Sequence, residues 1–215
     1  METLWAPWRM AYIMAGDRPD GECIFCAFPD DPAHWRDRLV LSVDGLPLHR
    51  RLFIGLLPDP DTRDALVEHQ RRWRWPRGSR PTKPASLHLT LYFLGEVDVV
   101  HERALRDVLA AEKTAPFDLV LRTPQCWSGG VAVLRSDANA ALDDLHERLA
   151  ARLVGADFTP PRGAWTPHVT LARDAQHCEP PHAAEPIVWP VADFVLVWSR
   201  TTPPTGYEVL DRYGA

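Results

Sequence analysis

The chain has 215 residues, 46% of them hydrophobic, and a formal net charge of -5 at pH 7. This length allows one sizeable core plus an appendage, and the negative charge argues against a generally cationic nucleic-acid coat. The chain lacks both the roughly 20-residue apolar run of a membrane-spanning helix and the N-terminal pattern of a signal peptide, so we expect a cytoplasmic protein without a membrane partner.

Residues 1–47 are expected to form an N-terminal appendage, in part disordered. Residues 4–9 (LWAPWR) and 23–26 (CIFC) resemble the opening of bacterial histidine-triad (HIT) proteins. In that family the Cys-x-x-Cys pair can contribute to a zinc site, but the family's His-x-His-x-His segment is absent from this chain, so HIT chemistry is not expected. A structural zinc needs four ligands, and only His34 and His49 lie near Cys23 and Cys26. A free dithiol is therefore favoured over zinc.

Residues 48–215 alternate strand and helix patterns. A strand is expected over 51–57, and the acidic, proline-containing residues 58–61 begin a helix that runs to about Trp73. Leucines spaced by three or four residues predict a helix over 138–153. The other expected elements are strands over 87–94, 117–121, 131–134, 191–199 and 206–210, a helix over about 99–111, and a strand from His168. This order predicts an α+β fold.

Residues 71–83 (RRWRWPRGSRPTK) interleave cations with indole rings, a mixture that suits phosphates and unstacked bases. The candidate RNA contacts are Arg74, Arg77, Arg80 and Lys83. The alternative is a helix end with solvated arginines, followed by a loop whose tryptophans cap the core. We leave both interpretations open.

A four-residue motif occurs twice, as His88-Leu-Thr-Leu and, 80 residues later, His168-Val-Thr-Leu. Residues i and i+2 of a strand share a face, so each copy presents one imidazole and one hydroxyl together while its apolar residues face the core. A proline-rich segment precedes each copy. The repetition predicts a bilobal fold with one catalytic pair between the lobes.

These motifs, with residues 51–54, Gly95, Arg173 and residues 207–210, resemble the 2H phosphoesterases, and among them the RNA 2',3'-cyclic phosphodiesterases also called 2'-5' RNA ligases. The resemblance covers roughly residues 48–213. It implies two antiparallel-type sheets with helices packed outside and a central cleft that carries both motifs. It also implies an RNA partner with a 2',3'-cyclic phosphate end, such as a tRNA-like fragment, a 2'-phosphate product, and reversible 2'-5' RNA ligation.

Two imidazoles that titrate near neutral pH can share the roles of general acid and general base. His88 and His168 are the candidates, and the sequence does not say which takes which role. Thr90 and Thr170 would donate to nonbridging phosphate oxygens, and Arg173 would add a charged donor. The scheme needs no cofactor or metal, and a monomer is expected.

Two other functions stay open. One is a noncatalytic module that binds RNA ends, and the other is a 2H phosphodiesterase that acts on a small cyclic nucleotide. Outside the motifs, Cys126 and Cys178 are expected to be reduced and without a special role. The remaining histidines are expected to be solvated, namely His49, His69, His101, His146, His177 and His182.

Overall fold

The computed structural model describes residues 42–43, 46–47, 49–160 and 164–214. The chain divides into two units, Met1–Leu48 and His49–Ala215. In the first unit, β1 (Ser42–Val43) pairs antiparallel with β2 (Leu46–Pro47). The HIT-like motifs and the candidate zinc ligands Cys23 and Cys26 lie outside the described residues.

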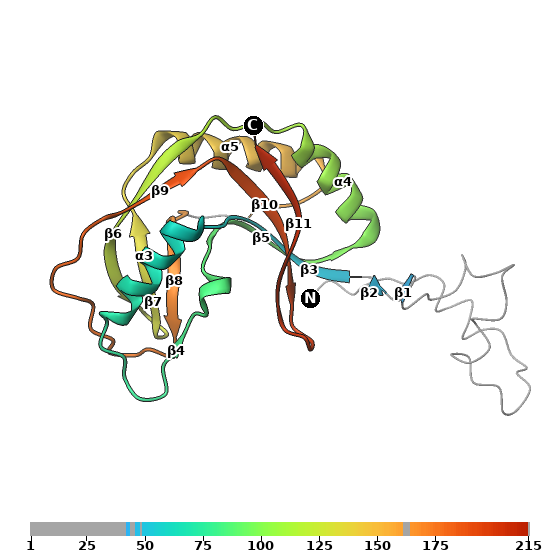
Figure 1. Ribbon diagram of the computed structural model, residues 1–215. Helices are drawn as coiled ribbons and strands as arrows, with labels where there is room; N and C mark the ends of the chain where they lie inside the picture. The colour runs from blue at the N-terminus through green and yellow to red at the C-terminus, as the bar shows by residue number, and fades with distance from the viewer. Residues whose placement is uncertain (1–41, 44–45, 48, 161–163, 215) are drawn as a thin grey trace, which may run out of the picture. The chain divides into compact units, whose positions relative to one another are not determined.

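The second unit is built on one antiparallel sheet of nine strands, ordered β11-β10-β3-β5-β8-β7-β6-β9, with β4 added beside β8 (Figure 1). The strands are β3 (His49–Leu56), β4 (Arg80–Pro81), β5 (Leu89–Asp98), β6 (Phe117–Trp127), β7 (Val131–Ser136), β8 (His168–Arg173), β9 (Ile187–Val191), β10 (Asp193–Arg200) and β11 (Gly206–Gly214).

The expectation of two sheets was wrong, because hydrogen bonding joins both halves of this unit. The halves meet between β5 and β8, where the pairing consists of Leu89 opposite Val169. Each half therefore keeps its own set of strands, and this short pairing brings the two motif strands side by side.

Three helices follow their predicted positions to within two residues at each end: α3 (Pro60–Arg71), α4 (Val99–Ala110) and α5 (Ala140–Gly155). Each starts at a side chain that accepts backbone N–H bonds, namely Asp59, Asp98 and Asn139, which satisfies donors that the first turn leaves free. The helix α4 contacts both α5 and the sheet (Figure 1).

The two faces of the sheet differ in burial. Alternate residues of β3, such as Leu52, Ile54 and Leu56, belong to the main core together with leucines from all three helices. On the opposite face, Phe53, Val195 and Val197 form a small separate cluster. Because strand residues alternate between faces, one face is packed against the helices, and the other is left to carry the polar side chains of the two motifs.

The strand predictions differ from the structure mainly at the C-terminal ends of the strands, which are longer than predicted. The strand expected over 117–121 continues to Trp127, the one over 206–210 continues to Gly214, and β10 begins at Asp193. The sequence analysis missed β4 and β9. The strand β9 contains Pro190 and lies at the sheet edge, where a residue without a backbone N–H is tolerated.

Candidate functional site

The pairing of Leu89 with Val169 determines how the two motifs meet. Both residues are fully buried, so the residues on either side of them point to the other face of the sheet. In an antiparallel pair, this register sets His88 opposite Thr170 and Thr90 opposite His168, with Cβ atoms of opposed residues about 4.5–5.5 Å apart. We call the face that carries these four side chains the motif face.

Both histidines are held in the same way. His88 Nδ1 lies 2.8 Å from the carbonyl oxygen of Ser86, and His168 Nδ1 lies 2.7 Å from that of Thr166. A carbonyl oxygen only accepts, so Nδ1 carries a proton in each ring. In both imidazoles Nε2 is therefore the nitrogen left to accept or donate a proton in chemistry.

Local sequence produces this geometry at each copy. Pro84 opens the short 3-10 helix η3 (Pro84–Ser86), which turns the chain directly before His88. Pro167 directly precedes His168 and keeps the residue before it extended. Each carbonyl is thereby placed two residues before its imidazole.

Aromatic side chains flank both imidazoles. The ring of Phe53 lies 4.8 Å from that of His88, and the ring of Tyr207 lies 5.1 Å from it, edge to face. On the other strand, Trp127 lies 4.4 Å from His168. These contacts fix the ring orientations and exclude water from one side of each histidine.

A β-bulge explains how Arg173 reaches the motif face. Thr170 pairs with Val133 and Ala172 with Ala132, so Leu171 is skipped in the register of β8 with β7. The extra residue shifts the alternation by one. Leu171 and Ala172 are both fully buried in the core, and Arg173 consequently points to the same side as Thr170.

The first motif has the same bulge at the matching residue. Thr90 pairs with Gly55 and Tyr92 with Ile54, so Leu91 is skipped. Leu91 and Tyr92 are both buried, and Phe93, the counterpart of Arg173, is 47% exposed. The repeat therefore extends beyond the His-x-Thr spelling to the backbone of the next three residues.

The pKa values of both histidines lie below their ordinary value. Burial is the main cause that lowers the pKa of His88, and the hydrogen bond to Ser86 opposes it. The charges of His168 and Arg173 lower the pKa of His88 further. A neutral imidazole is thus favoured at neutral pH.

The pKa of His168 is also lowered mainly by burial, against the hydrogen bond to Thr166. The charges of Arg173 and Arg135 add to the lowering. Arg173 thus acts on both histidines, which agrees with the placement by the bulge. The register confirms Arg135 as a neighbour, because it lies directly opposite His168 on β7.

Sequence analysis assigned no site role to Phe53, Tyr207, Trp127 or Arg135. Phe53 and Tyr207 lie in segments that carry the family resemblance, so a signal for them existed. Trp127 and Arg135 reach His168 only through the pairing of β6, β7 and β8, and one sequence holds no signal for that register.

The cationic segment 71–83 is only partly near the motifs. Arg74 forms an ion pair with Glu179 and Arg80 one with Asp174, while Arg80 also lies opposite Arg173 in the β4–β8 register. Arg77 and Lys83 are exposed. The RNA contacts of these four cations stay a prediction.

The tryptophans of this segment follow the alternative interpretation. Trp73 is buried in the core and stacks on Trp75, with ring centroids 5.0 Å apart. The indole N–H of Trp75 donates to the carbonyl of Gln70. These contacts hold both rings at the end of α3, and stacking on RNA bases stays a prediction.

Two of the six remaining histidines are not solvated as expected. His69 is buried on α3 beside Trp73. His146 is half-buried and stacks between Tyr92 and Trp165, at centroid distances of 4.3 and 3.8 Å. His69 and Trp73 are four residues apart, a spacing at which helix side chains meet, so a local signal for this contact existed. The partners of His146 come from other segments, and no local pattern indicates them. The other four are exposed, namely His49, His101, His177 and His182.

The expectation for Cys126 and Cys178 was also wrong, since they form a disulfide. The bond joins the end of β6 to the segment after β8, across a sequence separation of 52. Because the two cysteines are so far apart in sequence, their proximity arises from the fold alone.

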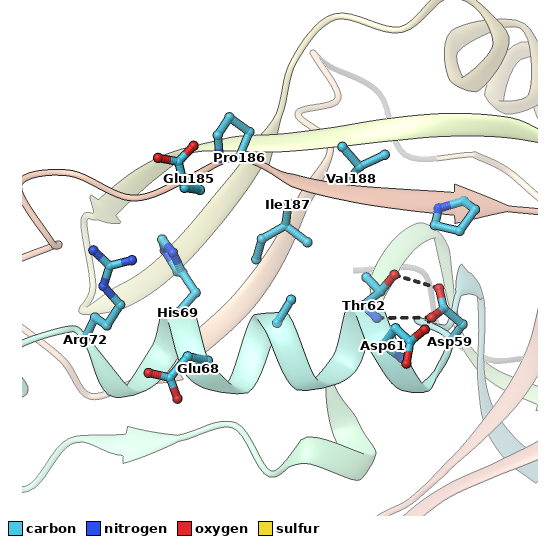
Figure 2. A pocket seen from close by; sticks show the side chains of 12 residues that line it. Asp59, Asp61, Thr62, Glu68, His69, Arg72, Glu185, Pro186, Ile187 and Val188 are labelled. Atoms are coloured by element: carbon cyan, nitrogen blue, oxygen red, sulfur yellow. Dashed lines mark hydrogen bonds between the residues drawn. The ribbon is translucent and has the colours of Figure 1, made fainter.

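The cavity in Figure 2 lies away from the motif side chains. It has a volume of about 510 Å³ and lies between α3 and a segment that includes Glu185, Pro186 and the first part of β9, with Thr62 and His69 on the helix side facing Ile187 (Figure 2). Among the described residues, no cluster of metal-ligating side chains is found. No described helix is long and apolar enough to cross a membrane.

Comparisons with known proteins agree on one family. The profile of the 2'-5' RNA ligase superfamily matches residues 57–202. An RNA 2',3'-cyclic phosphodiesterase of Thermus thermophilus is 35% identical over 184 residues, covering 76% of this chain and 89% of the relative. One from Escherichia coli is 28% identical over 128 residues, covering 59% and 73%.

The fold gives the same result. The crystal structure of Escherichia coli LigT complexed with 3'-AMP superposes with a TM-score of 0.66 at 26% identity, covering 77% of this chain and 97% of that chain. The comparisons do not support the HIT resemblance of the first 45 residues. Because the superfamily profile and the Thermus relative both match most of its length, the chain belongs to the 2'-5' RNA ligase superfamily.

Proposed function

We propose that the protein hydrolyses the 2',3'-cyclic phosphate at the end of an RNA to a 2'-phosphate, and that 2'-5' ligation is the parallel reaction in which the 5'-hydroxyl of a second RNA replaces water. The observation that carries the proposal is the register at β5 and β8, which sets His88 and His168 beside each other's motif threonine on one face. Each Nδ1 is bonded to backbone, so both Nε2 atoms are left for proton transfer.

The reaction requires two proton transfers around one phosphorus atom. One imidazole, neutral at Nε2, takes a proton from water as its oxygen attacks phosphorus. The other, protonated at Nε2, gives a proton to the 3' oxygen as its bond to phosphorus breaks. Protons balance within the pair. In ligation a 5'-hydroxyl takes the place of water, and each ring keeps its role.

The lowered pKa values suit the general base directly. Because burial and Arg173 favour neutral imidazoles in both positions, one histidine is ready to accept a proton at neutral pH. The anionic cyclic phosphate, once bound between the rings, favours the charged form of the other. Binding of the substrate would then favour the protonated imidazole that acts as the general acid.

Negative charge grows on the nonbridging phosphate oxygens in the transition state, and hydrogen-bond donors stabilise it. Thr90 and Thr170 each lie across from the other motif's histidine, and Arg173 follows Thr170 after the bulge. A guanidinium and two hydroxyls around one phosphate would stabilise the transition state more than the ground state, because its charge is larger there.

The relatives support this substrate class. The Thermus and Escherichia coli proteins are RNA 2',3'-cyclic phosphodiesterases, and Escherichia coli LigT has been crystallised with a nucleotide, 3'-AMP. For this chain, RNA with a cyclic phosphate end is the partner we infer. Action on a small cyclic nucleotide is the second candidate.

The test is hydrolysis of a short RNA that ends in 2',3'-cyclic phosphate, in the presence of EDTA, with the product phosphate assigned by ³¹P NMR. We expect a 2'-phosphate from the wild-type protein. A 3'-phosphate product would contradict the proposed leaving group. Binding of the RNA without turnover would favour a noncatalytic module, and turnover of cyclic mononucleotides alone would favour the second candidate.

A further inference from the structure

Arg135 is a cation on the motif face that the proposed reaction does not use. It lies opposite His168 in the β7–β8 register, and in an antiparallel pair opposed side chains share a face. The residue is half-buried, and its charge contributes to the lowered pKa of His168. The guanidinium therefore lies within electrostatic reach of the catalytic pair.

Within the described residues, Arg135 has weaker partners than other half-buried arginines of the fold. Its side chain donates one hydrogen bond, to Gln125 Oε1 at 3.5 Å, and its Nε is buried without a partner. Arg50 and Arg200 also have a buried Nε without a partner, but each of them forms an ion pair with a glutamate. By contrast, Glu112 pairs with both Arg148 and Arg152. A buried guanidinium donor without an acceptor is unfavourable, and an anionic ligand would remove that penalty.

The strand order indicates which anion this would be. In the proposed reaction the phosphate would lie between His88, directly before β5, and His168 on β8, and β7 follows on the far side of β8. Neighbouring strands are about 4.8 Å apart, so Arg135 is displaced outward from the reacting phosphate. In an RNA the next anion is the phosphodiester that links the terminal nucleotide to its neighbour.

We propose that Arg135 binds this penultimate phosphodiester and makes the protein prefer oligonucleotides over cyclic mononucleotides. The inference rests on the proposed function and names its substrate class more closely. Gln125 forms the polar side of the subsite, since it accepts from the indole N–H of Trp127 at 2.9 Å as well as facing Arg135. Trp127 in turn contacts His168, which connects the subsite to the catalytic ring.

The test compares two substrates in two variants. One substrate is adenosine 2',3'-cyclic phosphate, and the other is the dinucleotide ApA with a 2',3'-cyclic phosphate end. The variant is Arg135→Gln, and the matched control is Arg122→Gln, because Arg122 is an exposed arginine on the adjacent β6 that pairs with Asp137. Assays run on the pH plateau of each protein, so that a changed pKa of His168 does not enter.

We expect Arg135→Gln to lower kcat/KM for the dinucleotide by about 10- to 100-fold, mainly through KM, because a hydrogen-bonded charge pair is lost. The mononucleotide should change little, and Arg122→Gln should leave both substrates unchanged. Arg135→Lys should restore part of the loss. An unchanged substrate preference in folded Arg135→Gln would overturn the inference.

Failure of the proposed function would show differently, as no turnover of either substrate by the wild-type protein. Fluorescence anisotropy of a labelled short RNA with a cyclic phosphate end then tests the subsite independently. Weaker binding by Arg135→Gln than by Arg122→Gln would support the subsite. Equal binding would overturn it.

Discussion

The two motif strands share a backbone conformation and differ in the side chain that each presents after its bulge. In each, the histidine donates from Nδ1 to the carbonyl two residues before, and the leucine after the threonine is skipped in the register. The first strand then presents Phe93, whose ring lies 4.9 Å from the guanidinium carbon of Arg51. The second presents Arg173. The repeated backbone places the imidazole and hydroxyl groups, and the residues beyond the bulge give each half different chemistry.

The histidine is common to both motif strands, and its replacement is expected to have the largest effect on activity. His88→Ala and His168→Ala should each lower kcat/KM by about 100- to 10,000-fold, because each removes one proton-transfer group. His101→Ala is the control, since this histidine is exposed on α4. Steady-state kinetics on the cyclic-phosphate RNA measures kcat/KM for the wild-type protein and for all three variants. A histidine whose loss matches the control has no part in the reaction.

The two strands differ in the residue that follows the bulge, so replacing Arg173 and replacing Phe93 should have unequal effects on activity. Arg173→Gln should lower kcat/KM by about 100-fold through the loss of a charged donor, whereas Phe93→Leu should keep most of the activity. Since Arg173 lowers the pKa of both histidines, its removal should also move the acid limb of the pH profile to higher pH. Equal losses in both variants, or an acid limb that stays in place, would contradict this assignment.

The two threonines test whether the halves contribute alike. Thr90→Val and Thr170→Val keep the shape of the side chain and remove its hydroxyl. Each should lower kcat by about 10-fold or more, as expected for a hydrogen bond to a charged group. Single-turnover rates separate this effect from binding. If Thr90→Val has no effect while Thr170→Val does, only the second half binds the phosphate.

A smaller effect concerns stability in the first half. Gly55 lies opposite Thr90, and a Cβ there would approach the Leu89 carbonyl oxygen to 2.7 Å. Gly55→Ala should lower the free energy of unfolding by about 1–3 kcal/mol, as overpacking does. Gly155→Ala is the control, because its added Cβ meets nothing within 4 Å. Urea denaturation measures both, and equal stabilities would contradict the close approach.

Local patterns predicted a large part of this fold. The leucine spacing predicted α5, and the repeated His-x-Thr spelling predicted which residues share a face, because both depend on neighbours a few positions away. The single sheet, the disulfide and the placement of Arg135 depend on strands paired across long separations. No local signal in one sequence encodes those pairings.

The candidate site shows the same division. His88, Thr90, His168 and Thr170 were predicted from the motif alone, and the structure brings them onto one face. Arg173 was predicted from family resemblance, and its orientation needed the bulge. His146, which is half-buried and stacks on Trp165, was wrongly expected to be solvated, because its partner lies in another segment.

The central claim is that both motifs serve one reaction, and a double-mutant cycle tests it most directly. Groups that act as a unit are strongly non-additive. We therefore expect His88→Ala/His168→Ala to have nearly the same kcat/KM on the cyclic-phosphate RNA as the worse single variant. A double variant whose loss equals the product of the two single losses would show that the histidines act independently, and would contradict the account.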